Sequence, residues 1–189
     1  MLCLKSAACS LMLLIGVKLA LATPSAMQND PLVKDFEARV NRYLDLRKKE
    51  AGSSPRPTKS SDKLSDNQEQ LAARVKALRP DAKQGDIFTP EIAQYFRHQL
   101  SSSLAGPNGP MIRASLRHAE PLRGLSLRIN ETYPQGVPLQ STPPSLLLNL
   151  PPLPQELEYR IVGRNLLIRD TVPNIIVDFI PDALPSTGD

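Results

Sequence analysis

Residues 157–180 read LEYRIVGRNLLIRDTVPNIIVDFI. Three runs rich in leucine, isoleucine and valine, at 157–162, 166–169 and 175–180, alternate with two short segments of turn residues. Branched and aromatic side chains favour strands, whereas Gly163-Arg164-Asn165 and the segment with Pro173 and Asn174 favour tight connections between strands. The pattern predicts an antiparallel β-meander over residues 157–180.

An isolated meander is only marginally stable, so another element must cover one of its faces. Thr89-Pro90-Glu91 is a typical helix start, because it combines a capping hydroxyl, a proline in the first turn and an acidic residue near the positive end of the helix dipole. The apolar residues that follow recur at helical spacing: Ile92, Tyr95, Phe96, Leu100 and Leu104. We predict that this helix covers the sheet.

The segments around this helix give weaker patterns. Ser65 and Gln68 form a capping-box pattern for a helix that ends before Pro80. Residues 111–118 fit either a short helix or an irregular strand, and the alternation over 125–129 predicts a strand. Prolines recur over 134–154 and cannot donate hydrogen bonds within a sheet, so this segment is expected to be an arm around the domain or an edge strand.

The N-terminal part predicts a separate amphipathic helix within residues 23–51, which begins at Asp30-Pro31. Residues 52–64 are predicted to be a flexible linker, because 52–62 (GSSPRPTKSSD) contain no large apolar residue. A helix on such a linker is free to bury its apolar stripe on a partner. The predicted partner-binding residues are Val33, Phe36, Val40, Tyr43 and Leu44.

The basic run Arg47-Lys48-Lys49 closes this helix. Cations at a helix C-terminus interact favourably with its dipole, so a solvated helix end is the favoured interpretation. A contact with a membrane surface or a partner is the alternative.

Residues 1–22 have the three regions of a secretory signal peptide. Lys5 supplies a positive charge, residues 11–17 (LMLLIGV) are apolar, and Ala20-Leu21-Ala22 is a small-x-small cleavage pattern that would leave Thr23 first. Lys18 interrupts the apolar stretch, which is too short for a membrane span of about 20 residues. We expect an exported protein, periplasmic or secreted, with no stable membrane span after cleavage.

Removal of the signal changes the chemistry of the chain. Both cysteines, Cys3 and Cys9, lie within it, so the mature chain has no thiol and no disulfide. Removing Lys5 and Lys18 leaves 21 basic against 19 acidic residues, a net charge of +2. This small charge argues against a nucleic-acid partner, because nucleic-acid binding depends on strong positive fields.

The motif Tyr-Arg-x-Val-Gly-Arg-x-Leu-Leu-Ile-x-Asp, followed by Ile-Val-Asp-Phe-Ile, lies within residues 151–180. It resembles the C-terminal part of RcnB-like periplasmic proteins of nickel and cobalt homeostasis. The chain, including residues 85–90 (GDIFTP), also resembles exported bacterial proteins without an assigned role. These resemblances imply a bacterial periplasmic setting, and the first implies a role in metal homeostasis.

Candidate chemical groups are few. Nickel and cobalt favour imidazole ligands, but His98 and His118 stand twenty residues apart and have no partner at helical spacing. Ser126 lies in the middle of a predicted strand, not in the sharp strand–turn–helix of a serine hydrolase. Asp170 and Asp178 are paired carboxylates near several arginines, which favours ion pairs on an exposed sheet face over acid–base catalysis. Asn130-Glu131-Thr132 is a glycosylation sequon that matters only in a eukaryotic secretory pathway.

The sequence therefore predicts an α+β fold, in which two or three helices pack on a small antiparallel β-meander and the N-terminal helix is peripheral. The main domain is predicted over 65–184. No catalytic, cofactor-binding or metal-binding residue is assigned. The favoured function is a non-enzymatic envelope module that binds a protein or peptide. The alternatives are an accessory role in metal homeostasis or sensing, and a hydrolase that uses the two carboxylates.

Overall fold

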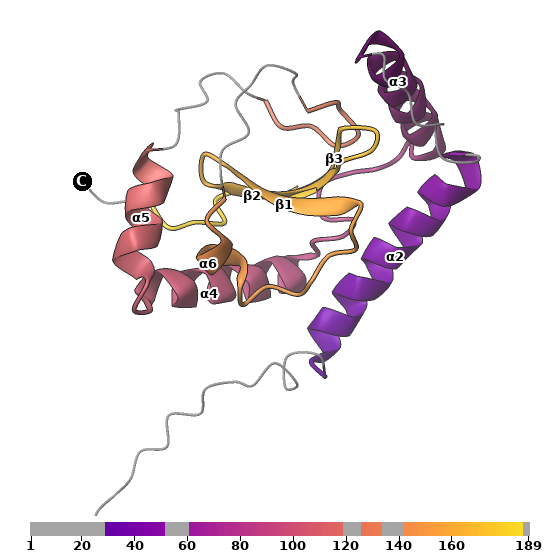
Figure 1. The fold of residues 1–189 in the computed structure, drawn as a ribbon. Coiled ribbons are helices and arrows are strands. Elements are labelled where there is room, and N and C mark those ends of the chain that lie inside the picture. Colours follow the sequence, from indigo (N-terminus) through magenta and orange to yellow (C-terminus); the bar gives the residue numbers. More distant parts are fainter. Residues whose placement is uncertain (1–28, 52–60, 119–125, 134–141, 187–189) are drawn as a thin grey trace, which may run out of the picture.

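The computed structural model describes residues 29–51, 61–118, 126–133 and 142–186, and it confirms the α+β class. Five helices precede a three-stranded sheet in this part of the chain (Figure 1). The predicted signal peptide, residues 52–60 of the predicted linker and residues 134–141 of the proline-rich segment lie outside it. The elements in chain order are α2 (Pro31–Ala51), α3 (Ser61–Leu78), α4 (Pro90–Ala105), α5 (Gly109–His118), α6 (Pro144–Leu147), β1 (Leu157–Val162), β2 (Asn165–Asp170) and β3 (Ile175–Ile180).

The helix starts follow local capping chemistry. The Asp30 carboxylate accepts a hydrogen bond from the Leu32 amide at 2.8 Å, and the Thr89 hydroxyl accepts one from the Ile92 amide at 3.4 Å. These caps confirm the predicted starts of α2 and α4. The start of α3 was predicted at Ser65 but lies at Ser61. Residues 61–64 contain no glycine or proline, so nothing in the backbone stops the helix from extending into the predicted linker.

The meander is confirmed, with strand order β1-β2-β3 and antiparallel pairing throughout. Val162 pairs with Asn165 across a two-residue turn, in which Gly163 has φ +60°. This positive φ is one that glycine adopts without steric cost. Between β2 and β3 the pairing changes from Ile168↔Asp178 to Arg169↔Ile176, so Val177 is an extra residue, a β-bulge.

Helices cover one face of the sheet, as predicted, and α4 runs beneath it in Figure 1. Phe96 of α4 lies at the centre of this packing. Its ring centroid is 5.0 Å from that of Phe36, 5.1 Å from Phe88 and 5.9 Å from Tyr159 of β1. Aromatic rings in such tilted and edge-on arrangements stabilise a core beyond the area they bury.

The second face of the sheet is also buried, which the sequence did not predict. Val162, Leu167 and Ile176 form a smaller cluster there with Tyr133, and Leu127 packs against it. Residues 126–130 are not the predicted strand: they are irregular chain that ends in a turn, and Thr132 makes a single bridge to Ile175. Asn130 has φ +62°, and this left-handed backbone interrupts an extended strand.

The N-terminal helix α2 lies along one side of the domain (Figure 1), yet it is not free to bind through its apolar stripe. The five predicted partner-binding residues are between 1% and 5% exposed, and all but Val33 belong to the main core: Val33, Phe36, Val40, Tyr43 and Leu44. The expectation of an open stripe is therefore corrected. These side chains complete the core of their own chain, because the sheet and α4 leave apolar surface that the stripe covers.

The proline-rich segment contains the short helix α6 followed by an extended arm. The Tyr159 hydroxyl donates to the Pro151 carbonyl at 2.9 Å, and the Leu157 amide donates to the Pro154 carbonyl at 2.9 Å. Both ends of the run Pro151–Pro154, called the arm below, are thereby fastened to the start of β1. The predicted arm is confirmed for this part.

Residues 111–118 were predicted to be either a short helix or an irregular strand. They belong to a helix, α5.

Replacing Asp178 with alanine tests the dependence of the fold on the bulge. The Asp178 carboxylate accepts hydrogen bonds from the amides of Gly85, Ile87 and Phe88 at 2.8–3.0 Å. Leaving such donors unpaired costs about 1–3 kcal/mol each, so we expect the free energy of unfolding in urea to fall by at least about 3 kcal/mol. The exposed Asp182→Asn substitution is the control, with an expected change within about 0.5 kcal/mol. Equal stability of Asp178→Ala and the control would contradict this assignment.

Candidate functional site

The two carboxylates that the sequence analysis singled out are internal groups. Asp170 and Asp178 are both 0% exposed, so the predicted exposed sheet face with ion pairs is wrong. The bulge at Val177 turns Asp178 to the helix-covered face, opposite Ile168. There, backbone amides donate hydrogen bonds to both oxygens of its carboxylate. Burial raises the pKa of Asp178, and the amide hydrogen bonds partly offset that rise.

Asp170 belongs to a buried network that joins α2 to β2. Its Oδ2 accepts a hydrogen bond from the Tyr43 hydroxyl at 2.7 Å and lies 3.1 Å from Nε of Arg47. The Arg47 N–H is not aimed at this oxygen, so the contact is an ion pair without a hydrogen bond. The Arg47 guanidinium also lies 3.4 Å from Glu156. Burial raises the pKa of Asp170, and the hydrogen bond from Tyr43 and the positive charge of Arg47 oppose this rise.

This network corrects the interpretation of the basic run at the end of α2. Arg47 is buried and paired, whereas Lys48 and Lys49 are exposed. The run is therefore not a continuous cationic surface. The arginines of the meander pair elsewhere: Arg160 and Arg169 both bind Glu158, on the face away from Asp170.

The sequon asparagine is also an internal group. Asn130 is 7% exposed, its side-chain nitrogen donates to the Arg79 carbonyl at 2.9 Å, and its side-chain oxygen accepts from Arg79 at 2.9 Å. A glycan on this nitrogen would need the folded contact to open. The folded structure therefore does not present Asn130 for modification.

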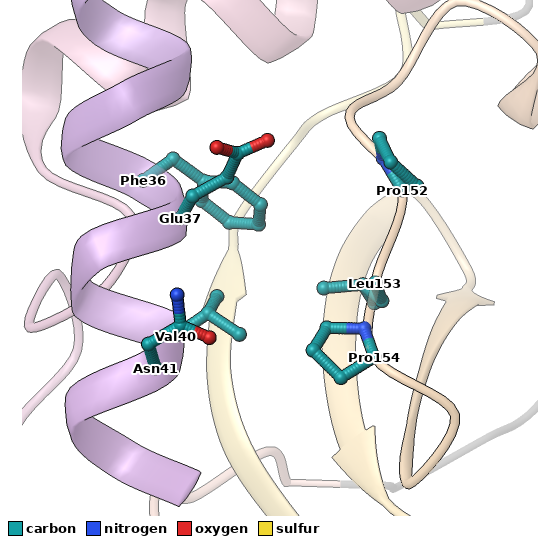
Figure 2. A pocket seen from close by; sticks show the side chains of 7 residues that line it. All are labelled: Phe36, Glu37, Val40, Asn41, Pro152, Leu153 and Pro154. Atoms are coloured by element: carbon teal, nitrogen blue, oxygen red, sulfur yellow. The ribbon is translucent and has the colours of Figure 1, made fainter. Parts of the chain in front are cut away.

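The described part of the chain has a groove between α2 and the arm (Figure 2), called the α2–arm groove below. Its volume is about 290 Å³. The apolar side chains of α2 line its floor, and Glu37 and Asn41 of the same helix stand at its rim (Figure 2). The lining residues are Phe36, Glu37, Val40, Asn41, Pro152, Leu153 and Pro154.

Local structure positions both walls of this groove. Residues 36, 37, 40 and 41 share one side of α2, because positions four apart lie one above the other on a helix. Across the gap, the prolines restrict the backbone of the arm to extended conformations. Leu153 carries the only backbone N–H between Pro151 and Pro154. The groove therefore combines an apolar floor, one extended wall and a few polar groups.

The polar groups at the rim are available to a ligand. Within the described part of the chain, neither Glu37 nor Asn41 makes a hydrogen bond or an ion pair with another side chain or with the backbone outside its helix. An apolar surface with a few convergent polar groups is the usual composition of a binding site. By contrast, Asp170 and Asp178 do not line this groove.

The sequence identified only part of this site. Two of the five predicted residues, Phe36 and Val40, lie on its floor, whereas Val33, Tyr43 and Leu44 do not line it. Glu37, Asn41 and the arm were missed. The proline run was a usable signal for a wall, but no local pattern connects it with a helix more than a hundred residues earlier.

Metal-ligand clusters and membrane-spanning helices are both absent from the described residues. No group of three or more histidine, cysteine, aspartate and glutamate side chains is arranged there to hold a metal ion. His98 is an exposed residue of α4. No helix in the described ranges has the length and apolar character needed to cross a membrane.

Comparisons with protein-family models, with curated proteins and with solved structures find no match to this chain.

An alkaline titration tests the packing around the α2 network. The chain has four tyrosines and no tryptophan, and burial raises the pKa of all four. The charge of Asp170 raises the pKa of Tyr43 further. A tyrosine whose pKa is raised by folding stabilises the folded state while it stays protonated. Because an unfolded tyrosine ionises at about pH 10, this contribution to the free energy of unfolding is complete below pH 10 and is lost as the pH rises toward the folded-state pKa values.

We therefore expect the buried tyrosines Tyr43, Tyr133 and Tyr159 to ionise together with unfolding, with tyrosinate followed by near-ultraviolet absorbance and unfolding by circular dichroism. The chain in denaturant is the control and should titrate at about pH 10. Ionisation of all four tyrosines at about pH 10 in a chain that still has its native circular dichroism would contradict the packing.

Proposed function

We propose that this chain is an exported, non-enzymatic module that binds an extended peptide segment of a partner protein in the α2–arm groove. The observation that carries the proposal is a groove with a partly exposed apolar wall, the arm, beside two rim groups, Glu37 and Asn41, that make no hydrogen bond or ion pair outside their helix in the described part of the chain. An extended peptide can place side chains against such a wall and use its backbone polar groups at the rim.

The internal position of the carboxylates favours this proposal over hydrolysis. A general acid or base must reach the substrate within hydrogen-bond distance. Asp170 and Asp178 are fully buried and already bind Tyr43, Arg47 and backbone amides. Their raised pKa values are explained by burial within the core, and they serve the fold in this proposal.

The groove is preformed, which also favours binding. The arm is fastened by Tyr159 and Leu157, and α2 is fixed by its buried stripe. A ligand that enters therefore orders few protein groups, so little conformational entropy opposes its binding.

Blocking the groove tests the proposed function. The probe is a fluorescein-labelled neutral peptide, Gly-Ser-Leu-norleucine-Leu-Ser-Gly, measured by fluorescence anisotropy with the chain that begins at Thr23. Asn41→Trp puts a bulky ring at the rim, and we expect it to weaken binding at least about tenfold, equivalent to roughly 1.4 kcal/mol.

The matched control is Ala38→Trp, an exposed position on the same helix that does not line the groove. This variant should bind as the wild type does. Circular dichroism checks that both variants fold. Equal binding by folded Asn41→Trp and wild type, or no binding of the peptide by wild type, would refute the groove as the site.

Export is proposed from residues 1–22 and has its own test. Expressed in a bacterial host, the protein should appear in the periplasmic fraction with Thr23 as its first residue, determined by N-terminal sequencing. Ala22→Phe should block cleavage, because signal peptidase accepts small residues there, and the uncleaved chain should accumulate. Ala7→Phe, earlier in the signal, is the control and should be cleaved normally. A cytoplasmic chain that begins at Met1 would contradict export.

A further inference from the structure

The charge of the α2–arm groove selects among peptides. Glu37 is the one charged residue that lines the groove, and no side chain in the described part of the chain neutralises it. The arm and the residues on either side of it, 142–150 and 155–156, contain no lysine or arginine. The groove therefore presents a single negative charge beside an apolar floor.

Nearby cations are already committed to other groups. Arg39, half a turn from Glu37, binds Asp35 through Nε at 2.9 Å and donates through Nη1 to the Asp86 carbonyl at 2.9 Å. Arg47 is held by Asp170 and Glu156. Lys34 is exposed and does not line the groove. Neither arginine is therefore available to cancel the charge at the rim.

The field of Glu37 also extends toward the sheet. Burial raises the pKa of Tyr159, and the charge of Glu37 raises it further. Tyr159 donates its hydroxyl proton to the Pro151 carbonyl, at the start of the arm. The carboxylate of Glu37 therefore acts across the groove as well as at the solvent-facing rim.

We propose that the peptide segment bound by the α2–arm groove carries a lysine or arginine that pairs with Glu37, next to an apolar side chain that packs against Pro152, Leu153 and Pro154 of the arm. This inference rests on the proposed function of the groove and names the class of peptide it selects. The cation provides selectivity, because a partly exposed ion pair contributes modestly and mainly discriminates among ligands.

Three labelled peptides that differ at one position test the inference: Gly-Ser-Leu-Xaa-Leu-Ser-Gly with lysine, norleucine or glutamate at Xaa. At low salt, wild type should bind the lysine peptide about two- to fivefold more tightly than the norleucine peptide, as expected for an exposed ion pair. The glutamate peptide should bind more weakly than both. The preference for lysine should shrink at high salt, since exposed charges are screened.

Glu37→Gln should abolish the preference for lysine and leave binding of the norleucine peptide unchanged. Glu69→Gln is the matched control, an exposed glutamate of α3 outside the groove, and it should keep the preference. Equal affinity of wild type for lysine and norleucine peptides, or a preference that persists in Glu37→Gln, overturns the inference and leaves the groove as a neutral peptide site. Failure of all three peptides to bind wild type overturns the proposed function itself.

Discussion

The β-bulge at Val177 determines which layer of the domain Asp178 faces, and that placement brings loop residues against the helix whose side chains form the groove floor. On the helix-covered face, Asp178 gathers the amides of Gly85, Ile87 and Phe88 around its carboxylate. The ring of Phe88 thereby comes to lie 5.8 Å from that of Phe36 on α2. Because Phe36 is part of the groove floor, one extra residue in a strand helps to position a surface site.

A buried polar network holds the other end of α2 against the sheet. Tyr43 and Arg47 bring a hydroxyl and a guanidinium to Asp170, which is fully buried, and Arg47 also pairs with Glu156 nearer the surface. Buried ion pairs add little net stability relative to apolar packing, but breaking one by removal of a partner is strongly destabilising. The network joins α2, the helix that carries Glu37 and Asn41, to β2 at Asp170.

Features that depend on neighbouring residues were predicted from the sequence, whereas contacts between distant segments were not. The meander, the caps at Asp30 and Thr89 and the covering helix α4 all depend on residues close together in the chain, and each was predicted correctly. The bulge was missed because Val177 and Asp178 fit simple alternation equally well. The strand predicted at 125–129 failed at Asn130, whose left-handed backbone is stabilised by distant contacts with Arg79 and Ile176. The groove needed α2 and the arm together, which no local pattern predicts.

The separation in sequence between α2 and the sheet has a consequence for the order of folding. Tyr43 and its hydrogen-bond partner Asp170 are 127 residues apart. At a synthesis rate of about 5–20 residues per second, α2 waits on the order of ten seconds before the strand it packs on has been made. During that interval the stripe can pack on α3 and α4, which are made earlier, but not on the sheet. The part of the stripe that faces the sheet, including Tyr43, therefore reaches its native partners only after β2 has been made.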